Sequence, residues 1–184
     1  MLNPKLSFSI VLTVLLIALS ACASSPAASS TGSPELDRVI EVVLGGDKGE
    51  LRELIHFTQA KCTHAEGLGG PPKCQGGEAE GTVVEVLPFL GPEGGFIRKS
   101  EIEAWEGIQV SKLFAVYETS DAVYSEENYP KGEFALVFIE DGETQLSYTL
   151  QVTDGKIVRI DHGFEFPPQI REDYVKQFLV EPIQ

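Results

Sequence analysis

Residues Glu133 to Asp161 read EFALVFIEDGETQLSYTLQVTDGKIVRID, and this stretch decides the fold. Residues 134–139 form a continuous apolar run, which is typical of a strand covered on both faces. Residues 145–153 instead alternate between apolar and polar side chains, which is typical of an antiparallel strand with one buried face. Asp141-Gly142 and Asp154-Gly155 are hairpin turn signals. The stretch therefore predicts three antiparallel strands joined by tight turns.

Further strands are predicted before this stretch, and a helix is predicted after it. Residues 82–87 are rich in β-branched side chains and lie between Gly81 and Pro88, so they are expected to be a strand. Residues 113–119 are expected to be another. Residues 121–132 form an acidic, aromatic loop between strands. After Pro167-Pro168 interrupts the chain, apolar residues at helical spacing predict a last short amphipathic helix: Ile170, Tyr174, Phe178 and Leu179.

Three helices are predicted in the N-terminal half. Ser33-Pro34-Glu35 is a helix start signal, and it is followed by one apolar face: Leu36, Val39, Ile40, Val43 and Leu44. A capping box at Asp47 predicts a second helix running to about Thr58. Ser100 and Glu103 also have the spacing of a capping box, which predicts a third helix that ends near residues 107–110. Helices gathered before an antiparallel sheet indicate an α+β fold, with short N-terminal helices packed on one face of a curved sheet.

This order of elements, together with the closing segment Val152 to Ile160, resembles the NTF2-like (cystatin-like superfamily) fold. The resemblance covers roughly residues 35 to 162 and implies a curved sheet that wraps a helical layer to form a cone. That fold hosts enzymes, ligand carriers and protein-binding modules alike, so the resemblance implies no single function.

The N-terminus has the features of an export signal. Lys5 precedes an apolar run from Leu6 to Leu19, which is too short to read as a membrane-spanning helix. The residues Leu19-Ser20-Ala21-Cys22 resemble the lipobox of bacterial lipoprotein signals. The resemblance implies a signal peptide at residues 1–21, removed on export, and acyl chains on Cys22 that attach the protein to a membrane. The alternative is an ordinary signal peptide with a coincidental cysteine.

Residues 22–34 contain no large apolar side chain, so they are expected to be a disordered tether. Residues 35–184 then form a single α+β domain. The resemblance to lipoproteins implies a location on the extracytoplasmic face of a bacterial membrane. Ala23 and Ser24 lack the aspartate associated with inner-membrane retention, so the outer membrane is expected where there are two membranes.

The charge of the chain excludes one class of partner. The sequence has 14 Lys and Arg against 28 Asp and Glu, a formal net charge of -14. Nucleic acids are bound through clusters of basic side chains, so a nucleic-acid partner is not expected. The same acidity disfavours adhesion to anionic lipid, which leaves the acyl chains as the source of membrane affinity.

Cys62 and Cys74 are expected to form a disulfide that closes the loop of residues 62–74, called the stapled loop below. Outside the cytosol, two cysteines at this spacing are most simply paired, and the lipobox resemblance assigns Cys22 to lipid. The rival interpretation is a metal site formed by Cys62, His64 and Cys74, with or without His56, but the paired Cys-x-x-Cys of structural zinc sites is absent. Neither a metal nor a cofactor is therefore expected.

Catalytic motifs such as Gly-x-Ser-x-Gly or His-Glu-x-x-His are absent from the sequence. The weak candidates for acid-base chemistry are Asp161 and His162, paired with Tyr117 or Tyr148 in the mouth of a cone. Adjacent strand residues point to opposite faces, so Asp161 and His162 are not expected in one pocket. The only Trp, Trp105, is expected to pack on the sheet, or else to line a ligand pocket with the two tyrosines.

Two functions from different classes fit these observations. The first is a lipid-anchored, non-catalytic binding module of the cell envelope, whose ligand is a small apolar molecule or an envelope protein that docks on the stapled loop. The second is a small pocket enzyme, a hydrolase or isomerase, with Asp161 or His162 as the base. Buried polar groups that converge in a deep pocket would favour the enzyme.

Overall fold

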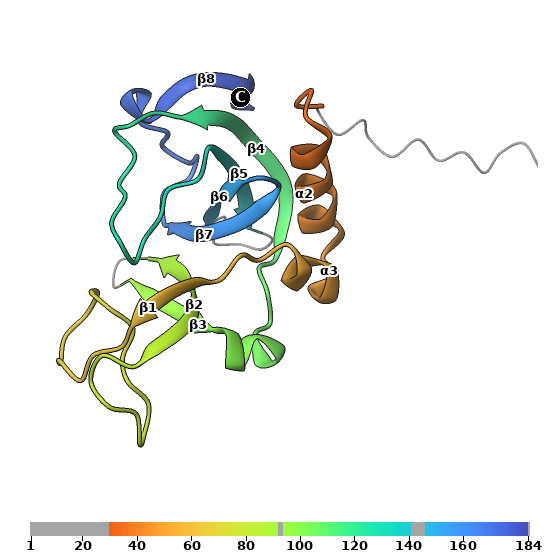
Figure 1. Cartoon of the computed structure of the whole chain (residues 1–184). Helices are drawn as coiled ribbons and strands as arrows, with labels where there is room; N and C mark the ends of the chain where they lie inside the picture. Colours follow the sequence, from red (N-terminus) through yellow and green to blue (C-terminus); the bar gives the residue numbers. More distant parts are fainter. Residues whose placement is uncertain (1–29, 92–93, 141–145, 184) are drawn as a thin grey trace, which may run out of the picture.

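The computed structural model describes residues 30–91, 94–140 and 146–183 (Figure 1). Within these ranges, the helices are α2 (Pro34–Gly45), α3 (Lys48–Glu53) and the short 3-10 helices η1 (Lys99–Ala104) and η2 (Glu172–Tyr174). The strands are β1 (Thr58–Lys61), β2 (Val83–Leu90), β3 (Gly95–Arg98), β4 (Val110–Thr119), β5 (Phe134–Glu140), β6 (Ser147–Thr153), β7 (Lys156–Gly163) and β8 (Val175–Val180). Among the described helices, none is long and apolar enough to cross a membrane.

The described strands form one open sheet, which confirms the α+β class. Its order is β1-β2-β7-β6-β5-β4-β8, and β3 pairs with β2 off this path. Every pairing is antiparallel except β2 with β7, which run parallel where Phe89 lies beside Ile160. Within the sheet, the central strands therefore join the N-terminal hairpin through the short parallel pairing of β2 with β7.

The predicted meander is confirmed as β5, β6 and β7. Leu136 pairs with Leu150, and Leu150 pairs with Ile160, so these three side chains share one buried face. The turn between β6 and β7 has Asp154 and Gly155 at φ values of 50° and 67°, as a hairpin of type I′ requires. The other predicted turn, Asp141-Gly142, lies outside the described residues.

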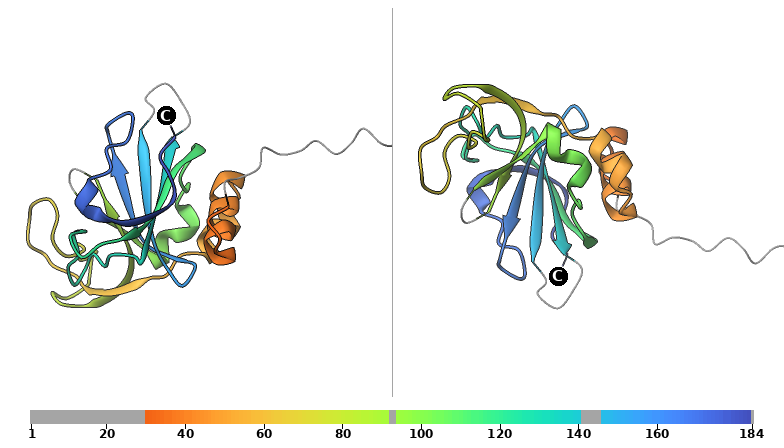
Figure 2. Two further views of the ribbon diagram at one scale, coloured as in Figure 1. Left: turned by 90° about the horizontal axis from the view of Figure 1, so that it is seen from above. Right: turned by 90° about the horizontal axis from the view of Figure 1, so that it is seen from below.

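Helix α2 covers one face of the sheet. The hydroxyl of Ser33 accepts a hydrogen bond from the Leu36 N–H at 3.4 Å, which confirms Ser33 as the N-cap. The predicted apolar face of α2 is buried in the main core together with Leu136, Leu150 and Ile157. Full burial of each such side chain contributes about 1.5 to 3 kcal/mol. Figures 1 and 2 show α2 and α3 on one side of the strands, with α2 beside β4.

The predicted second helix is too long. α3 ends at Glu53, although Asp47 caps it as expected by accepting the Glu50 N–H at 2.9 Å. Beyond it, the Ile157 N–H donates to the Leu54 carbonyl at 2.8 Å, and the His56 N–H donates to the Ile157 carbonyl at 2.9 Å. Pairing with β7 therefore stops the helix, and the chain continues into β1.

The predicted third helix is wrong in type. Residues Lys99–Ala104 form the 3-10 helix η1, whose N-cap is Arg98, and no side chain caps it. The Trp105 N–H donates to the Ile102 carbonyl at 3.2 Å, a spacing of three residues that closes a 3-10 turn. η1 therefore ends before Gly107, and β4 begins at Val110.

The predicted last helix is a strand. Residues 175–180 form β8, which pairs with the outer edge of β4, with Tyr117 beside Phe178. Their rings meet edge to face, with centroids 5.9 Å apart. The edge of β4 offers unpaired backbone groups, and satisfying them outweighs the weak helical spacing of this segment. Strand β8 thereby helps to cover the face of the sheet opposite α2.

The two faces of the central strands differ in character. Alternate residues of β5 point to opposite sides, so Leu136 and Phe138 join the core under α2. Ala135 and Val137 join a second, smaller cluster on the other side, with Tyr117. Along β6 and β7 this second face becomes polar, and the candidate site lies there.

Candidate functional site

A cavity of about 550 Å³ lies on the sheet face opposite α2. Volumes of roughly 300 to 1,000 Å³ are usual for small-molecule sites. Residues 121–132 and 163–174 contribute its cover. Its floor is formed by alternating side chains of β6 and β7, namely Ser147, Thr149, Gln151, Arg159 and Asp161. The cavity therefore has a polar floor inside a largely apolar fold.

The floor is organised by an ion pair between Arg159 and Asp161. The Arg159 side chain is only 2% exposed, and its Nε and Nη2 donate to the two carboxylate oxygens of Asp161 at 2.7 and 2.9 Å. The Gln151 amide donates to the same carboxylate at 3.2 Å. This fork-to-fork geometry holds the two charges in one orientation, with the Arg159 side chain buried and 27% of the Asp161 side chain exposed.

Arg159 also fixes the segment that covers the cavity. Its Nη1 donates to the carbonyls of Tyr124, Tyr129 and Pro130 at 2.8 to 3.2 Å. The Gly132 N–H donates to the Gln151 side-chain carbonyl at 3.0 Å. A Cβ on Gly132 would lie 2.3 Å from the Val152 nitrogen, so only glycine lets the chain approach β6 this closely. The cover at residues 121–132 is therefore tied to the floor.

Burial controls the titration of the cavity residues. It raises the pKa of Asp161, although the positive charge and hydrogen bonds of Arg159 oppose this shift. Burial, and secondarily the negative charge of Asp161, raise the pKa of Tyr117 to about 12. Tyr117 is therefore a neutral phenol at physiological pH and lines the cavity as a hydrogen-bond donor and acceptor.

His162 borders the same cavity from an aromatic cluster. Its ring stacks on Tyr148 with centroids 4.7 Å apart and an interplanar angle of 10°. The centroid of the Phe164 ring lies 4.7 Å from that of His162, and the centroid of the Phe89 ring lies 6.2 Å from it. The Nε2 atom of His162 is buried and has no hydrogen-bond partner among the described residues.

The mouth of the cavity is aromatic. Tyr124 and Phe164 line it, although their side chains are 44% and 56% exposed. Arg171 also lies at this rim, but its guanidinium donates to Asp173 at 2.6 and 3.0 Å and sits 4.4 Å from the Tyr174 ring centroid. The cation at the rim is therefore already paired.

The predicted site residues are only partly brought together. Tyr117 and Asp161 line one cavity, whereas Tyr148 lies behind His162. Trp105 packs against the core under α2, and its carbonyl accepts a hydrogen bond from Arg52 at 3.0 Å. Trp105 therefore packs against the core cluster and is not among the residues that line the cavity.

Asp161 and His162 both border the cavity, contrary to expectation. They do point to opposite faces of β7, since His162 pairs with Tyr148 and Asp161 with Thr149. The cavity, however, continues past the end of β7, where Gly163 and Phe164 complete its wall. Strand alternation does not separate the two residues here, because the cavity is not confined to one face of β7.

The residues that build the floor escaped the sequence-based interpretation. The alternation of residues 145–153 predicts that Ser147, Thr149 and Gln151 face solvent, yet Ser147 is 5% and Gln151 is 2% exposed. A signal was present: across the predicted hairpin, Gln151 pairs with Arg159 and Thr149 with Asp161. This pairing places Arg159 and Asp161 beside polar residues of the neighbouring strand, but such pairs also occur on open surfaces, so the sequence alone does not show that the face is covered.

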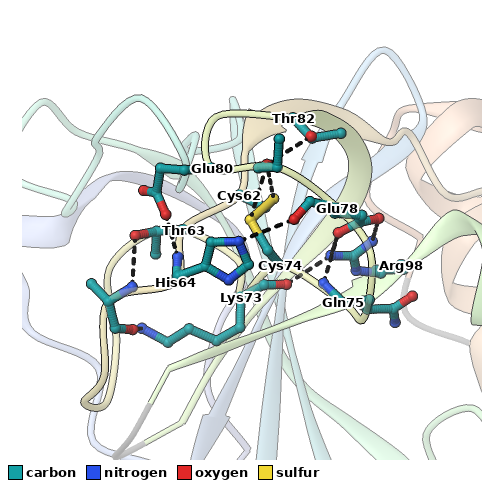
Figure 3. The surroundings of a disulfide bond; sticks show 12 residues. Cys62, Thr63, His64, Lys73, Cys74, Gln75, Glu78, Glu80, Thr82 and Arg98 are labelled. Carbon is teal, nitrogen blue, oxygen red and sulfur yellow. Dashed lines mark hydrogen bonds and ion pairs between the residues drawn. A yellow bond between two sulfur atoms is a disulfide. The ribbon is translucent and has the colours of Figure 1, made fainter.

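The expected disulfide between Cys62 and Cys74 is present, with Cα atoms 4.9 Å apart (Figure 3). Around it, the guanidinium of Arg98 donates to both carboxylate oxygens of Glu78 at 2.6 and 2.8 Å. Hydrogen bonds from Arg98 lower the pKa of Glu78 to about 2. The ring of His64 contacts the Glu78 carbonyl through Nε2 at 3.0 Å. The stapled loop is thus held by a network as well as by the disulfide.

The geometry around the disulfide bears on the metal alternative. Two groups of potential ligands lie within 4.8 Å of one another: Cys62, Cys74 and Glu78, and His64, Cys74 and Glu80. Both depend on a cysteine whose sulfur is joined to its partner, and a disulfide offers no thiolate. His56 belongs to neither group.

A second cavity of about 410 Å³ lies beside the stapled loop. Pro71, Pro72 and Phe96 contribute apolar surface to it, and Leu68 at its edge is 75% exposed. The phenol of Tyr129 donates to the Gly70 carbonyl at 3.0 Å and so links this loop to the cover of the first cavity.

Comparisons with protein-family models, with curated proteins and with solved structures find no match for this chain. No relative therefore assigns a role to either cavity. The function has to be inferred from side-chain geometry, and the best defined geometry is that of the cavity over β6 and β7.

Proposed function

We propose that this protein is a lipid-anchored component of the cell envelope whose folded part is a non-catalytic binding module. The ligand site is the cavity over β6 and β7, and its ligand is a small molecule. Cys22, which would carry the acyl chains, lies outside the described residues, so the anchor rests on the lipobox resemblance alone. The NTF2-like kinship is likewise a proposal, supported by the antiparallel strands β4 to β7 with a helix across one face.

The observation that carries this proposal is the buried floor. Placing Arg159 and Asp161 under a cover costs desolvation energy, and a merely structural face could be filled by apolar side chains instead. The floor also modifies the expectation of an apolar ligand, because Ser147, Thr149 and Gln151 present hydrogen-bonding groups. A preformed cavity with a few fixed polar groups is the usual form of a small-molecule site.

An enzyme is the second candidate, and one observation favours it. Asp161 has a raised pKa and lies near Tyr117, which is a plausible acid-base pair. However, both carboxylate oxygens of Asp161 accept hydrogen bonds from Arg159, and Gln151 donates to one of them. A carboxylate held in this way is placed to orient groups rather than to accept a proton from a substrate.

Native mass spectrometry tests the proposal. The full-length protein is extracted from membranes in a mild detergent and sprayed without denaturation. We expect a species heavier by one small molecule, either after purification or after addition of a metabolite library. In Thr149→Phe, a larger side chain fills the cavity and this species should disappear. In the matched control Thr58→Phe, on β1, it should persist.

Two outcomes would contradict the proposal. One is a protein that carries no small molecule in either condition, and the other is an adduct that survives Thr149→Phe. Turnover of a bound molecule that is lost in Asp161→Asn, with binding retained, would favour the enzyme. Turnover that is unaffected by Asp161→Asn and by His162→Ala would exclude an enzyme that uses either residue as its base.

A further inference from the structure

We infer that the ligand of the cavity over β6 and β7 is a neutral saccharide. The inference rests on the proposed function, because it names the ligand class of the same cavity. It follows from three features of the walls: a floor without net charge, hydroxyl groups that the protein leaves unused, and an aromatic mouth.

The floor offers no free charge to a ligand. Arg159 gives Nε and Nη2 to Asp161, and it gives Nη1 to three backbone carbonyls. The two side chains therefore neutralise each other, and neither an anion nor a cation finds an unpaired partner there. At the rim, Arg171 is paired with Asp173. Glu165 is exposed at the rim, where solvent screens its charge.

Three hydroxyl groups of the lining are unused. Within the described residues, those of Tyr117, Ser147 and Thr149 form no hydrogen bond with protein atoms. The oxygen atoms of these hydroxyls are not completely enclosed by protein atoms. They are therefore accessible from the cavity. Each hydroxyl can donate one hydrogen bond and accept others. An apolar ligand would remove them from water without compensation, which is unfavourable.

The mouth of the cavity supplies the complementary apolar surface. Tyr124 and Phe164 line it with exposed rings, and Tyr174 also belongs to the cavity lining. Aromatic side chains combine a large apolar face with low conformational freedom. A pyranose ring has hydroxyl groups around its edge and C–H groups on its faces. It therefore matches hydroxyls on the floor and aromatic rings at the mouth, and it carries no charge.

The test uses one sugar ring in three charge states. N-acetylglucosamine is neutral, glucosamine is a cation and glucuronate is an anion at pH 7. Their binding to the full-length protein in detergent is measured by saturation-transfer NMR and calorimetry. Glucose, galactose and β-linked disaccharides extend the neutral set. We expect saturable binding of one or more neutral sugars and weaker binding of the charged forms.

Conservative variants connect binding to the floor. Thr149→Val and Ser147→Ala remove a hydroxyl with little change of shape. Each should weaken binding about threefold to tenfold, the effect of one lost hydrogen bond. Thr58→Val is the matched control, because Thr58 is a strand threonine outside the cavity lining, and it should leave the affinity unchanged.

The possible contrary results separate the two proposals. Preferential binding of glucosamine or glucuronate, with sensitivity to Thr149→Val, would overturn the neutral saccharide and keep the binding module. Neutral sugars that bind equally well to Thr149→Val and Ser147→Ala would place the saccharide elsewhere. Absence of sugar binding in a protein that carries another small molecule displaced by Thr149→Phe would refute the ligand class alone.

Discussion

At the scale of single residues, one feature separates this protein from an ordinary sandwich of apolar layers: the buried pair Arg159 and Asp161. The pair lies on the sheet face that faces away from α2, and it holds both the cavity floor and the cover at residues 121–132. A second pair, Arg171 and Asp173, has the same spacing and a similar fork geometry, but it lies at the surface. The chain thus contains its own control for the effect of burial.

Replacing Arg159 with Met should destabilise the protein by about 3 kcal/mol, because it leaves the Asp161 carboxylate, whose side chain is only 27% exposed, without its partner. The matched change Arg171→Met should cost less than about 1 kcal/mol, since both side chains of that pair are more than half exposed. Urea unfolding of both variants measures the difference. Equal losses of unfolding free energy in the two variants would show that the Arg159–Asp161 pair stabilises the protein no more than the exposed Arg171–Asp173 pair does.

The Glu78 carboxylate gives a pH dependence with a defined sign. Its pKa in the folded protein is about 2, below the ordinary value of 4.5, because Arg98 donates hydrogen bonds to it. Its contribution to stability is therefore complete above about pH 4.5 and is lost as the pH falls towards 2. Glu78→Gln should lower the melting temperature at pH 6 and converge with the wild type near pH 2.

Melting curves between pH 2 and pH 6 measure this effect. The control is Glu103→Gln, which changes a carboxylate whose side chain is 85% exposed in its pair with Arg52. We expect its curve to follow the wild type across the range. A Glu78→Gln curve that also runs parallel to the wild type would contradict the assigned role of Arg98.

At the scale of elements, the stapled loop is the part whose stability depends most on a covalent bond. Residues 62–74 contain little regular structure, and the disulfide restricts the unfolded chain. For a loop of this length the chain-entropy model gives about 3 kcal/mol. The double variant Cys62→Ala with Cys74→Ala should lose this amount in urea unfolding.

Reduction provides the control for the disulfide. A phosphine reductant should destabilise the wild type by the same amount and leave the double variant unchanged. A wild type insensitive to reduction, with a double variant of equal stability, would mean that the network around Arg98 and Glu78 holds the loop alone.

Local signals in the sequence predicted the elements that depend on local interactions. Ser33 caps α2, and Asp154-Gly155 forms the expected turn, because both are decided within a few residues. β1 and β8 were missed, because each exists only through pairing with a strand distant in sequence. Thr58 lies in β1 and Phe178 in β8, although the local sequence pattern predicts a helix at both.

The candidate site was predicted only in part, for a similar reason. Asp161 and Tyr117 could be named from their residue types, but the cover that encloses them could not. Residues 163–174 fold over the polar face only because β8 returns to the edge of β4. The burial of Arg159 therefore follows from topology, which no local pattern in β7 encodes.

At the scale of the whole molecule, the proposed anchor and the cavity make separate predictions. Cys22→Ser removes the residue that would carry the acyl chains, so the variant should move from the membrane fraction to the soluble fraction. Metabolic labelling with an alkyne fatty acid should mark the wild type and not the variant. A variant that stays with membranes and still carries label would refute lipidation at Cys22. Ligand binding should be the same in both forms.

The most direct test of the central claim, that the cavity over β6 and β7 is the ligand site, is hydrogen-deuterium exchange of the full-length protein. Exchange is measured with and without a saturating small molecule from the binding screen. We predict slower exchange in residues 147–163 and in the cover at residues 121–132 and 163–174, with little change in β1 to β3. Protection confined to the stapled loop at residues 62–74 would contradict the account and move the binding site to that loop.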